Sequence, residues 1–349
     1  MELKYESFAD VDLSDSFFDS LREDYQGFND WFVSKAQKGD EAYVIRDQNH
    51  SIQGFLYLKI EEEEHSDITP NLPRARRVKV GTLKINAHGT RLGQRFIKKM
   101  VDWAVSNSIN ELYVTVFSKH VHLIKLLERY GFEYWGKKSS SSGDENVLIK
   151  TIGRVTGDLE KDYPVLDASR KAYILSIYPQ FHTKLFPDSI LKNETPDIVK
   201  DISSSNSIHK IYICNLKGVE SLRRNDVLVI YRTADGGSAE YTSVATSMGV
   251  VEETRSIYDF HNEQEFLDYA SPYSVFSVEE LKNLWRTKRY PKIIRFTYNV
   301  SLSKRPNRKS LIEDVGIDRD AYAGFMELSS EQLKKIAALG KINESIIIN

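Results

Sequence analysis

"INAHGTRLGQRFIKKM", residues 85–100, decides the fold of the first half of the chain. It begins at the end of an apolar strand, passes through a glycine-containing turn and continues as a helix that carries cations. A strand that leads through a turn into a helix directs backbone N–H groups and the positive helix end at one point. The stretch therefore predicts a phosphate-binding turn. The helix itself is predicted by apolar residues spaced three and four apart: Phe96, Ile97, Met100, Val101, Ala104 and Val105.

Two common nucleotide-binding loops do not fit this turn. A Walker A loop needs GxxxxGK followed by Ser or Thr, and the sequence contains no such run. A dinucleotide-binding GxGxxG is also missing, because Gly89 and Gly93 are four residues apart. The turn therefore belongs to neither of these nucleotide-binding classes.

Composition suggests two domains and names no partner. The chain has 349 residues, a net charge of −2 and one cysteine, Cys214, which excludes an internal disulfide framework. No apolar run approaches the length of a membrane span and the first residues are acidic, so we expect a soluble cytoplasmic protein. The polar segment 155–170 is the predicted linker between a domain at 1–154 and a domain at 171–349.

The first domain reads as an α/β pattern around the opening stretch. The order is helix, hairpin, strand–turn–helix and then strand–helix–strand. The predicted helices and strands are the helical segment 14–38, the hairpin 42–60, the strand 76–85, the strand 111–117, the helix 121–130 and the strands 132–138 and 146–152.

This order resembles the GNAT acyltransferase family, in which a loop after the fourth strand binds the pyrophosphate of acetyl-CoA. The family pattern [Q/R]-x-x-G-x-[G/A] falls on residues 88–93, where the last glycine is kept and Arg91 replaces the first. LLERYGFEYWG (126–136) is similar to a second family segment. The resemblance implies a mixed twisted sheet flanked by helices, acetyl-CoA as cosubstrate, and cofactor-binding roles for Leu83, Ile85, His88, Gly89, Thr90, Arg91, Leu92, Gly93, Gln94 and Arg95.

The catalytic residues of the family do not carry over directly. Many members place a tyrosine acid where this chain has Leu127, and a frequent asparagine aligns with His120. Tyr130, one helical turn from Leu127, is the candidate acid, and His120 is the candidate base. His122 or a carboxylate of residues 61–64 are alternative bases. The competing interpretation is that Tyr130 is a core aromatic and that the histidines cap a helix or lie on the surface.

The second domain is β-rich, with helices inserted, and predicts a small barrel-like α+β fold. Its first strand ends in ILSIYP (174–179), which resembles the opening of the ASCH domain, a PUA-like fold. The following strands also resemble PUA-like domains, including the EVE type, and these families imply RNA or modified bases as ligands. The G-x-K-x-x-E-x-R segment common in ASCH domains is missing. The predicted strands are 171–179, 209–216, 226–233, 243–253 and 292–300, followed by a C-terminal helix at 329–340.

A basic run at residues 281–310 independently suggests nucleic-acid binding. It contains ten Lys or Arg and no Asp or Glu, and four aromatic residues are interleaved with the cations. Cations for phosphates and aromatics for bases are what single-stranded nucleic acid requires, although a strand with a solvated loop would explain the run equally simply. The candidate contacts are Trp285, Arg286, Arg289, Lys304, Arg305, Arg308 and Lys309.

Three functions follow as alternatives. The first is an acetyl-CoA-dependent N-acetyltransferase whose second domain presents RNA or an RNA-attached amine. The second keeps the enzyme but gives it a protein lysine or a small amine as acceptor. The third is a non-catalytic protein that binds CoA or RNA. We expect no metal site, since one cysteine excludes CxxC arrangements, and Cys214 lies in an apolar strand, as an inert core thiol would.

Overall fold

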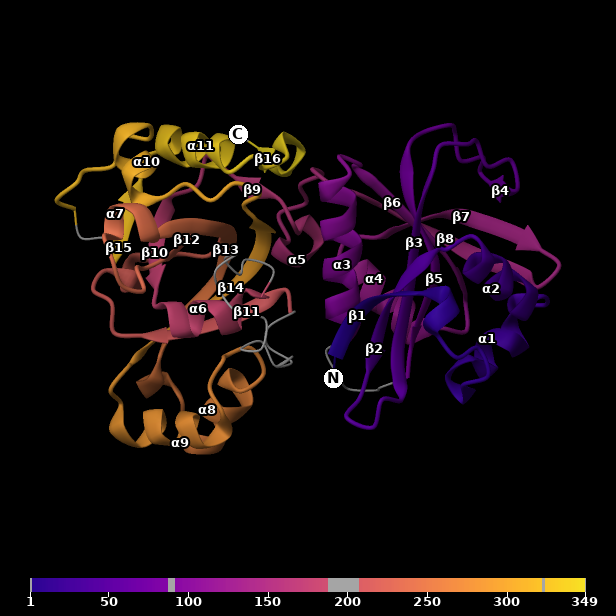
Figure 1. The fold of residues 1–349 in the computed structure, drawn as a ribbon, viewed down its shortest axis with the longest axis horizontal. Coiled ribbons are helices and arrows are strands. Elements are labelled where there is room, and N and C mark those ends of the chain that lie inside the picture. The colour runs from indigo at the N-terminus through magenta and orange to yellow at the C-terminus, as the bar shows by residue number, and fades with distance from the viewer. Residues whose placement is uncertain (1, 87–91, 188–206, 322–323, 349) are drawn as a thin grey trace. The chain divides into compact units, whose positions relative to one another are not determined.

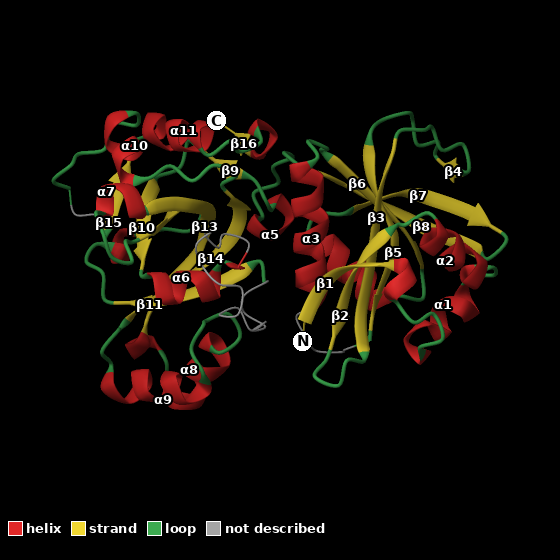
Figure 2. Cartoon of the chain, viewed as in Figure 1, coloured by secondary structure: helices red, strands yellow, loops and turns green. Residues whose placement is uncertain are grey.

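The computed structural model describes residues 2–86, 92–187, 207–321 and 324–348. The chain divides into two compact units, Met1–Tyr163 and Pro164–Asn349. Figure 1 traces the chain by residue number, and Figure 2 shows the helices and strands of each unit. The predicted linker 155–170 contains the short helix α5 (Leu159–Asp162) and the strand β9 (Leu166–Asp167). No helix in the described part of the chain is long and apolar enough to cross a membrane.

The N-terminal unit is a mixed α/β unit built on an eight-stranded sheet with the order β1-β2-β3-β5-β6-β8-β7-β4. Strands β5 and β6 are parallel, and the other neighbouring pairs are antiparallel. The strands are β1 (Glu2–Ser7), β2 (Glu41–Arg46), β3 (Ile52–Glu61), β4 (Ile68–Thr69), β5 (Arg77–Ile85), β6 (Glu111–Phe117), β7 (Glu133–Ser140) and β8 (Gly143–Thr151).

Helices cover both faces of this sheet, and neighbouring residues of β3 show which helices cover which face. Gly54 faces α3 so closely that a Cβ there would lie 2.8 Å from the Phe96 ring. Phe55 packs into the aromatic cluster of the first two helices, 5.4 Å from Phe18 between ring centroids. Successive residues of a strand point to opposite faces. The helices are α1 (Asp19–Asp24), α2 (Phe28–Gln37), α3 (Leu92–Ser106) and α4 (Val121–Arg129), with α3 on one face and the α1–α2 cluster on the other.

Most of the predicted pattern of this unit is confirmed. The hairpin at 42–60 is β2–β3, and the strand and helix of the opening stretch are β5 and α3. The helical segment 14–38 is divided into a 3₁₀ turn, α1 and α2, with a break at Gly27, whose φ of 83° lies in the left-handed region. Strand β1 was not predicted, although Leu3 and Tyr5 alternate with polar residues in ELKYES.

The C-terminal unit holds a six-stranded sheet with the order β11-β14-β13-β12-β10-β15. Within the described residues the sheet keeps two edge strands, β11 and β15, so the predicted small barrel is instead an open sheet there. Strands β10 and β12 are parallel, and the other neighbouring pairs are antiparallel. The strands are β10 (Ala172–Ile177), β11 (His209–Cys214), β12 (Val227–Arg232), β13 (Val244–Ser256), β14 (Lys292–Ser301) and β15 (Phe325–Leu328), with a separate pair formed by β9 and β16 (Ile347–Ile348).

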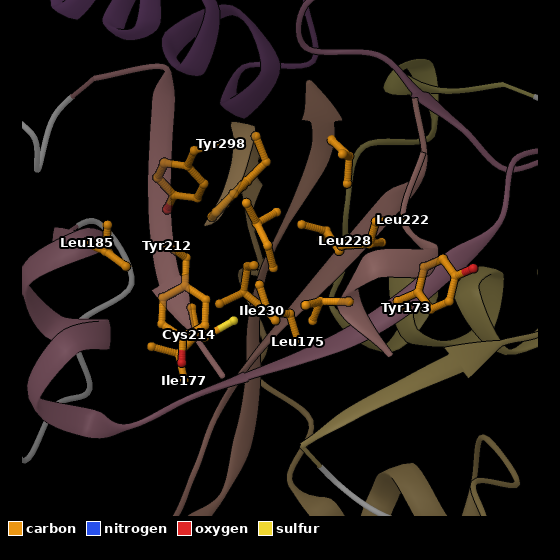
Figure 3. Packing of buried hydrophobic residues seen from close by; sticks show 14 of the residues in the cluster. Tyr173, Leu175, Ile177, Leu185, Tyr212, Cys214, Leu222, Leu228, Ile230 and Tyr298 are labelled. Atoms are coloured by element: carbon orange, nitrogen blue, oxygen red, sulfur yellow. The ribbon is translucent and has the colours of Figure 1, made fainter. Parts of the chain in front are cut away.

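Apolar side chains from several strands of this sheet meet in one core, which Figure 3 shows. Every residue of β10, β11 and β12 is buried, as expected for strands covered on both faces. Cys214 lies in this core, where burial raises the pKa of its thiol to about 11, so the prediction of an inert core thiol is confirmed. The helices are α6 (Pro179–Leu185), α7 (Ala239–Thr242), α8 (Glu263–Ala270), α9 (Val278–Thr287), α10 (Arg308–Glu313) and α11 (Ser330–Leu339).

Candidate active site

A cleft forms in the N-terminal unit where the two parallel strands separate. Strands β5 and β6 pair only from Val78↔Leu112 to Val80↔Val114. Beyond that point β5 continues to Ile85 against β3, and β6 continues to Phe117 against β8. The facing edges of the two strands are therefore not paired with each other in the described residues, and their backbone N–H and C=O groups are available to an extended ligand.

An extra residue in β5 bends the strand at the point of separation. Tyr57 pairs with Thr82 and Leu58 pairs with Val80, so Gly81 is inserted in the register as a β-bulge. A Cβ at Gly81 would lie 2.6 Å from the ring of Tyr57, which leaves room only for glycine. Because a bulge bends its strand and increases the local twist, Gly81 turns the end of β5 away from β6.

A pocket of about 310 Å³ opens at this separation. Its walls come from the turn between α1 and α2, from β5 and β6, from the start of α4, and from β7 and β8. Aromatic residues Tyr25, Phe28 and Trp31 provide an apolar wall, while the polar groups come from the sheet and from α4. A small apolar pocket with a few convergent polar groups is the usual form of a small-molecule site.

Two carboxylates lie near α4: Glu145 lines the pocket, and Asp24 contacts His120, which lines it. Glu145 accepts a hydrogen bond of 2.8 Å from the Tyr25 hydroxyl, and burial together with Glu145 raises the pKa of that phenol above its ordinary value. Asp24 is 3.1 Å from Nε2 of His120 and also pairs with Lys119. The His120 side chain is 41% exposed whereas that of Asp24 is 8% exposed. This arrangement can accept a proton from a bound amine and pass it to solvent.

Ammonium groups lie along the other side of the pocket. Lys79 Nζ is 3.8 Å from Glu61, and burial lowers the pKa of Lys79. Glu61 also pairs with Lys59 and accepts a hydrogen bond from the Tyr113 hydroxyl. These bonds hold the pKa of Glu61 below its ordinary value although burial acts in the opposite direction. Of the acids at 61–64 proposed as bases, Glu61 therefore acts as a partner of lysines.

Helices α3 and α4 begin after the carboxyl ends of the parallel strands β5 and β6. Both positive helix ends therefore lie at the same edge of the sheet as the cleft. Gly93, in the first turn of α3, lets the helices approach, because a Cβ there would lie 2.5 Å from Leu126 of α4. Gly93, the glycine that matches the predicted loop pattern, thus has a packing role in addition to its predicted role in phosphate binding.

The structure places the predicted cofactor residues in three groups. Leu83 lines the pocket, and Ile85 is half-buried at the end of β5. Leu92, Gln94 and Arg95 are buried on α3. The predicted loop residues His88, Gly89, Thr90 and Arg91 lie outside the described residues, so their role stays a prediction.

The two candidate catalytic residues lie in different environments. His120 lines the pocket. Tyr130 is fully buried at the end of α4, and its backbone carbonyl accepts a hydrogen bond of 2.8 Å from Lys150. This position favours the core-aromatic interpretation of Tyr130. His122 is exposed and does not line the pocket.

Sequence reasoning missed two side-chain pairs at the end of the pocket near α4. Tyr25 and Glu145 are 120 residues apart, and Asp24 and His120 are 96 apart, so no local spacing connects them. The only sequence signal was the YQG break in the first helical segment, which produces the turn that carries Tyr25.

The predicted nucleic-acid contacts do not form one patch. Trp285 and Arg286 lie on α9 and Arg289 follows it, whereas Lys304, Arg305, Arg308 and Lys309 follow the far end of β14. Ten residues of strand span roughly 33 Å, and β14 runs between the two groups. Phe296 and Tyr298 of the run are fully buried in the core and cannot stack on bases. Trp285 stacks on Phe266 instead, with 5.7 Å between ring centroids.

Several solved acetyltransferase structures are similar to the N-terminal half of the chain. An N-acetyltransferase from Staphylococcus aureus Mu50 is 12% identical, with a TM-score of 0.34, over 43% of this chain and 96% of that chain. Arabidopsis thaliana NAA60 in complex with acetyl-CoA is 18% identical, with a TM-score of 0.30, over 43% of this chain and 100% of that chain.

An ASCH protein from Zymomonas mobilis is also similar, at 11% identity and a TM-score of 0.32, over 49% of this chain and 96% of that chain. No protein-family model and no curated protein sequence matches the chain.

Proposed function

We propose that the N-terminal unit transfers the acetyl group of acetyl-CoA directly to an amine. The observation that carries this proposal is the separation of β5 and β6, with His120, which Asp24 contacts, lining the pocket at the point of separation. The free strand edges match a ligand that is extended and carries amides, as the pantetheine arm does. The two helix ends at the same edge supply positive charge for its phosphates.

The reaction is an attack of the neutral amine on the thioester carbonyl. The amine first binds as an ammonium ion near Asp24 and Glu145 and loses its proton to His120, whose exposed side passes it to water. The nitrogen lone pair then forms the C–N bond, the C–S bond breaks as the tetrahedral intermediate collapses, and the second nitrogen proton passes to the departing thiolate, which gives the amide and free CoA. Because thiols ionise near pH 8.5, the thiolate is a good leaving group at neutral pH. A buried Tyr130 therefore does not prevent the reaction.

Titration calorimetry with acetyl-CoA and with acetyl-pantetheine tests the cleft. We expect both to bind, because the strand edges contact the part that the two ligands share. Arg91, which lies outside the described residues, is proposed to contact phosphate. Arg91→Ala is therefore expected to weaken the binding of acetyl-CoA by about 1.5–3 kcal/mol, the value of a charge-assisted hydrogen bond. The binding of acetyl-pantetheine, which lacks the pyrophosphate, should be unchanged. Absence of binding by either ligand at millimolar concentration would remove the proposal.

A groove in the C-terminal unit favours a second function, the binding of single-stranded nucleic acid. The groove has a volume of about 470 Å³ and lies between α6 and α9. The rings of Phe181 and Phe276 pack against each other in its wall, tilted by 54° with 5.4 Å between centroids, and the charged lining residues are Lys184, Arg289 and Glu280. Aromatic rings beside cations are suited to bases beside phosphates. We propose that this groove, and not the whole basic run at residues 281–310, is the nucleic-acid site.

The paired substitutions Lys184→Gln and Arg289→Gln test this groove. Each lysine or arginine that contacts a phosphate contributes about one to the slope of log affinity against log salt. We expect the double variant to bind a short single-stranded RNA more weakly and with a slope smaller by about two. Lys304→Gln, in the loop after β14, is the matched control. An equal loss in the control variant, measured by fluorescence anisotropy, would contradict the assignment.

A further inference from the structure

The acceptor pocket has charges of opposite sign at its two ends. The charged groups that act on Lys79 are Glu61, Lys138, Lys59 and Asp67. Three ammonium groups therefore face two carboxylates around Lys79, which leaves one positive charge among these described residues when His65 is neutral. At the other end, four carboxylates face three cations, which leaves one negative charge among the described residues when His120 is neutral. The carboxylates are Asp19, Glu23, Asp24 and Glu145, and the cations are Arg22, Lys84 and Lys119.

The strand register places these two charged ends apart along the sheet. Lys79 is opposite Tyr113 of β6, and Glu145 is opposite Phe117 of the same strand. Four residues of strand separate the two positions, or roughly 13 Å between backbones. Lys138 is opposite Glu145, but its ammonium group is 2.9 Å from Asp67 and is therefore neutralised locally.

Lys79 is the cation with the weakest counterion on this side of the pocket. Its nearest carboxylate oxygen is 3.8 Å away, on a Glu61 that also pairs with Lys59 and Tyr113. Its side chain is only 16% exposed, so its charge is poorly screened by water. An anionic group of a bound molecule would complete its coordination.

We propose that the acceptor is a small amino acid whose amine and carboxylate are at opposite ends of a short aliphatic chain. The amine lies at Asp24, Glu145 and His120, and the carboxylate lies at Lys79. The volume of about 310 Å³ is at the lower end of the range for small-molecule sites and suits such a molecule. A diamine is disfavoured, because its second ammonium group would face the positive charge around Lys79. This inference rests on the proposed acetyl transfer.

Steady-state acetylation of three amines tests the proposal: 5-aminopentanoate, pentylamine and pentane-1,5-diamine. We expect kcat/KM for the amino acid to exceed that for pentylamine by roughly tenfold or more, the effect of one charge-assisted contact, and the diamine to be the poorest. Lys79→Met should remove the advantage of the amino acid, and Lys79→Glu should favour the diamine. Lys137→Met is the control, because Lys137 is an exposed lysine of β7 that does not line the pocket.

Equal kcat/KM for amino acid and pentylamine, or an advantage that survives Lys79→Met, would overturn the proposal. Saturation-transfer NMR with the same three amines in the absence of acetyl-CoA separates this proposal from the proposed reaction. If 5-aminopentanoate binds in a way that depends on Lys79 but no acetyl transfer occurs, the pocket binds this class of amino acid and the proposed transferase reaction is wrong. If amines are acetylated with no dependence on Lys79, the transferase reaction stands and the contact between Lys79 and a carboxylate is wrong.

Discussion

Replacing His120 with glutamine is expected to lower kcat for acetyl transfer by about 10²–10⁴-fold, the usual contribution of a general base. His120 is held by a buried carboxylate, Asp24, at the point where β5 and β6 separate. Glutamine keeps a polar side chain there but cannot accept the proton of the ammonium ion. Stopped-flow detection of free CoA thiol measures this loss.

A matched control is present on the same helix. His122 is two residues along α4, exposed and outside the pocket, so His122→Gln is expected to leave kcat unchanged. Asp24→Asn should give an intermediate loss of kcat with little change in KM, because Asp24 acts through His120. Equal losses in the two histidine variants would mean that α4 as a whole, and not His120, supports the reaction.

The C-terminal unit is expected to lose up to about 5 kcal/mol of stability as the pH falls from 6.5 towards 3, because of one histidine. His182 is fully buried on α6, and its Nε2 lies 2.8 Å from the Thr246 hydroxyl. Burial, and then the charges of Arg232 and Arg305, lower its pKa from 6.5 to about 3. Between these values the unfolded chain binds a proton that the folded chain does not, so stability decreases as the pH falls. The full difference between the two pKa values corresponds to roughly 5 kcal/mol.

Urea unfolding of the full chain at several pH values, followed for wild type and His182→Gln, isolates this effect. Carboxylates titrate in the same range, but they are common to both proteins and cancel in the difference. The glutamine variant should be less stable at pH 7 and lose less stability on acidification. If the free energy of unfolding changed with pH in the same way for both proteins, protonation of His182 would not destabilise the folded state and the prediction would be wrong.

Local pattern predicted the local elements of the site and failed where distant segments meet. Strand β5 and helix α3 were predictable, because their signal lies within and just before sixteen consecutive residues. The bulge at Gly81 was not, since it is defined by the register against Tyr57 on another strand. The acceptor pocket combines Tyr25 with Glu145 and Asp24 with His120, and only the folded sheet brings these pairs together.

Charge and periodicity also needed the fold for their interpretation. The basic run at 281–310 is continuous in sequence, but β14 carries its second half away from α9. Tyr130 has the spacing of a helix-borne acid, yet it lies at the end of α4 with its ring turned into the core. Sequence spacing gives the distance along an element and cannot give the side that faces the ligand.

The bulge at Gly81 shifts the alternation of side chains along β5 by one residue. Directly opposite residues of antiparallel strands share a face, so Val80 lies on the face of Leu58 and Thr82 on the face of Tyr57. Without the extra residue, positions 80 and 82 would point the same way. Lys79, opposite Lys59, and Thr82, opposite Tyr57, therefore share one face of the sheet, whereas Leu83, opposite Leu56, points to the other face. Under the proposed function, acceptor preference can change through Lys79 and Thr82 without altering the side chain of Leu83.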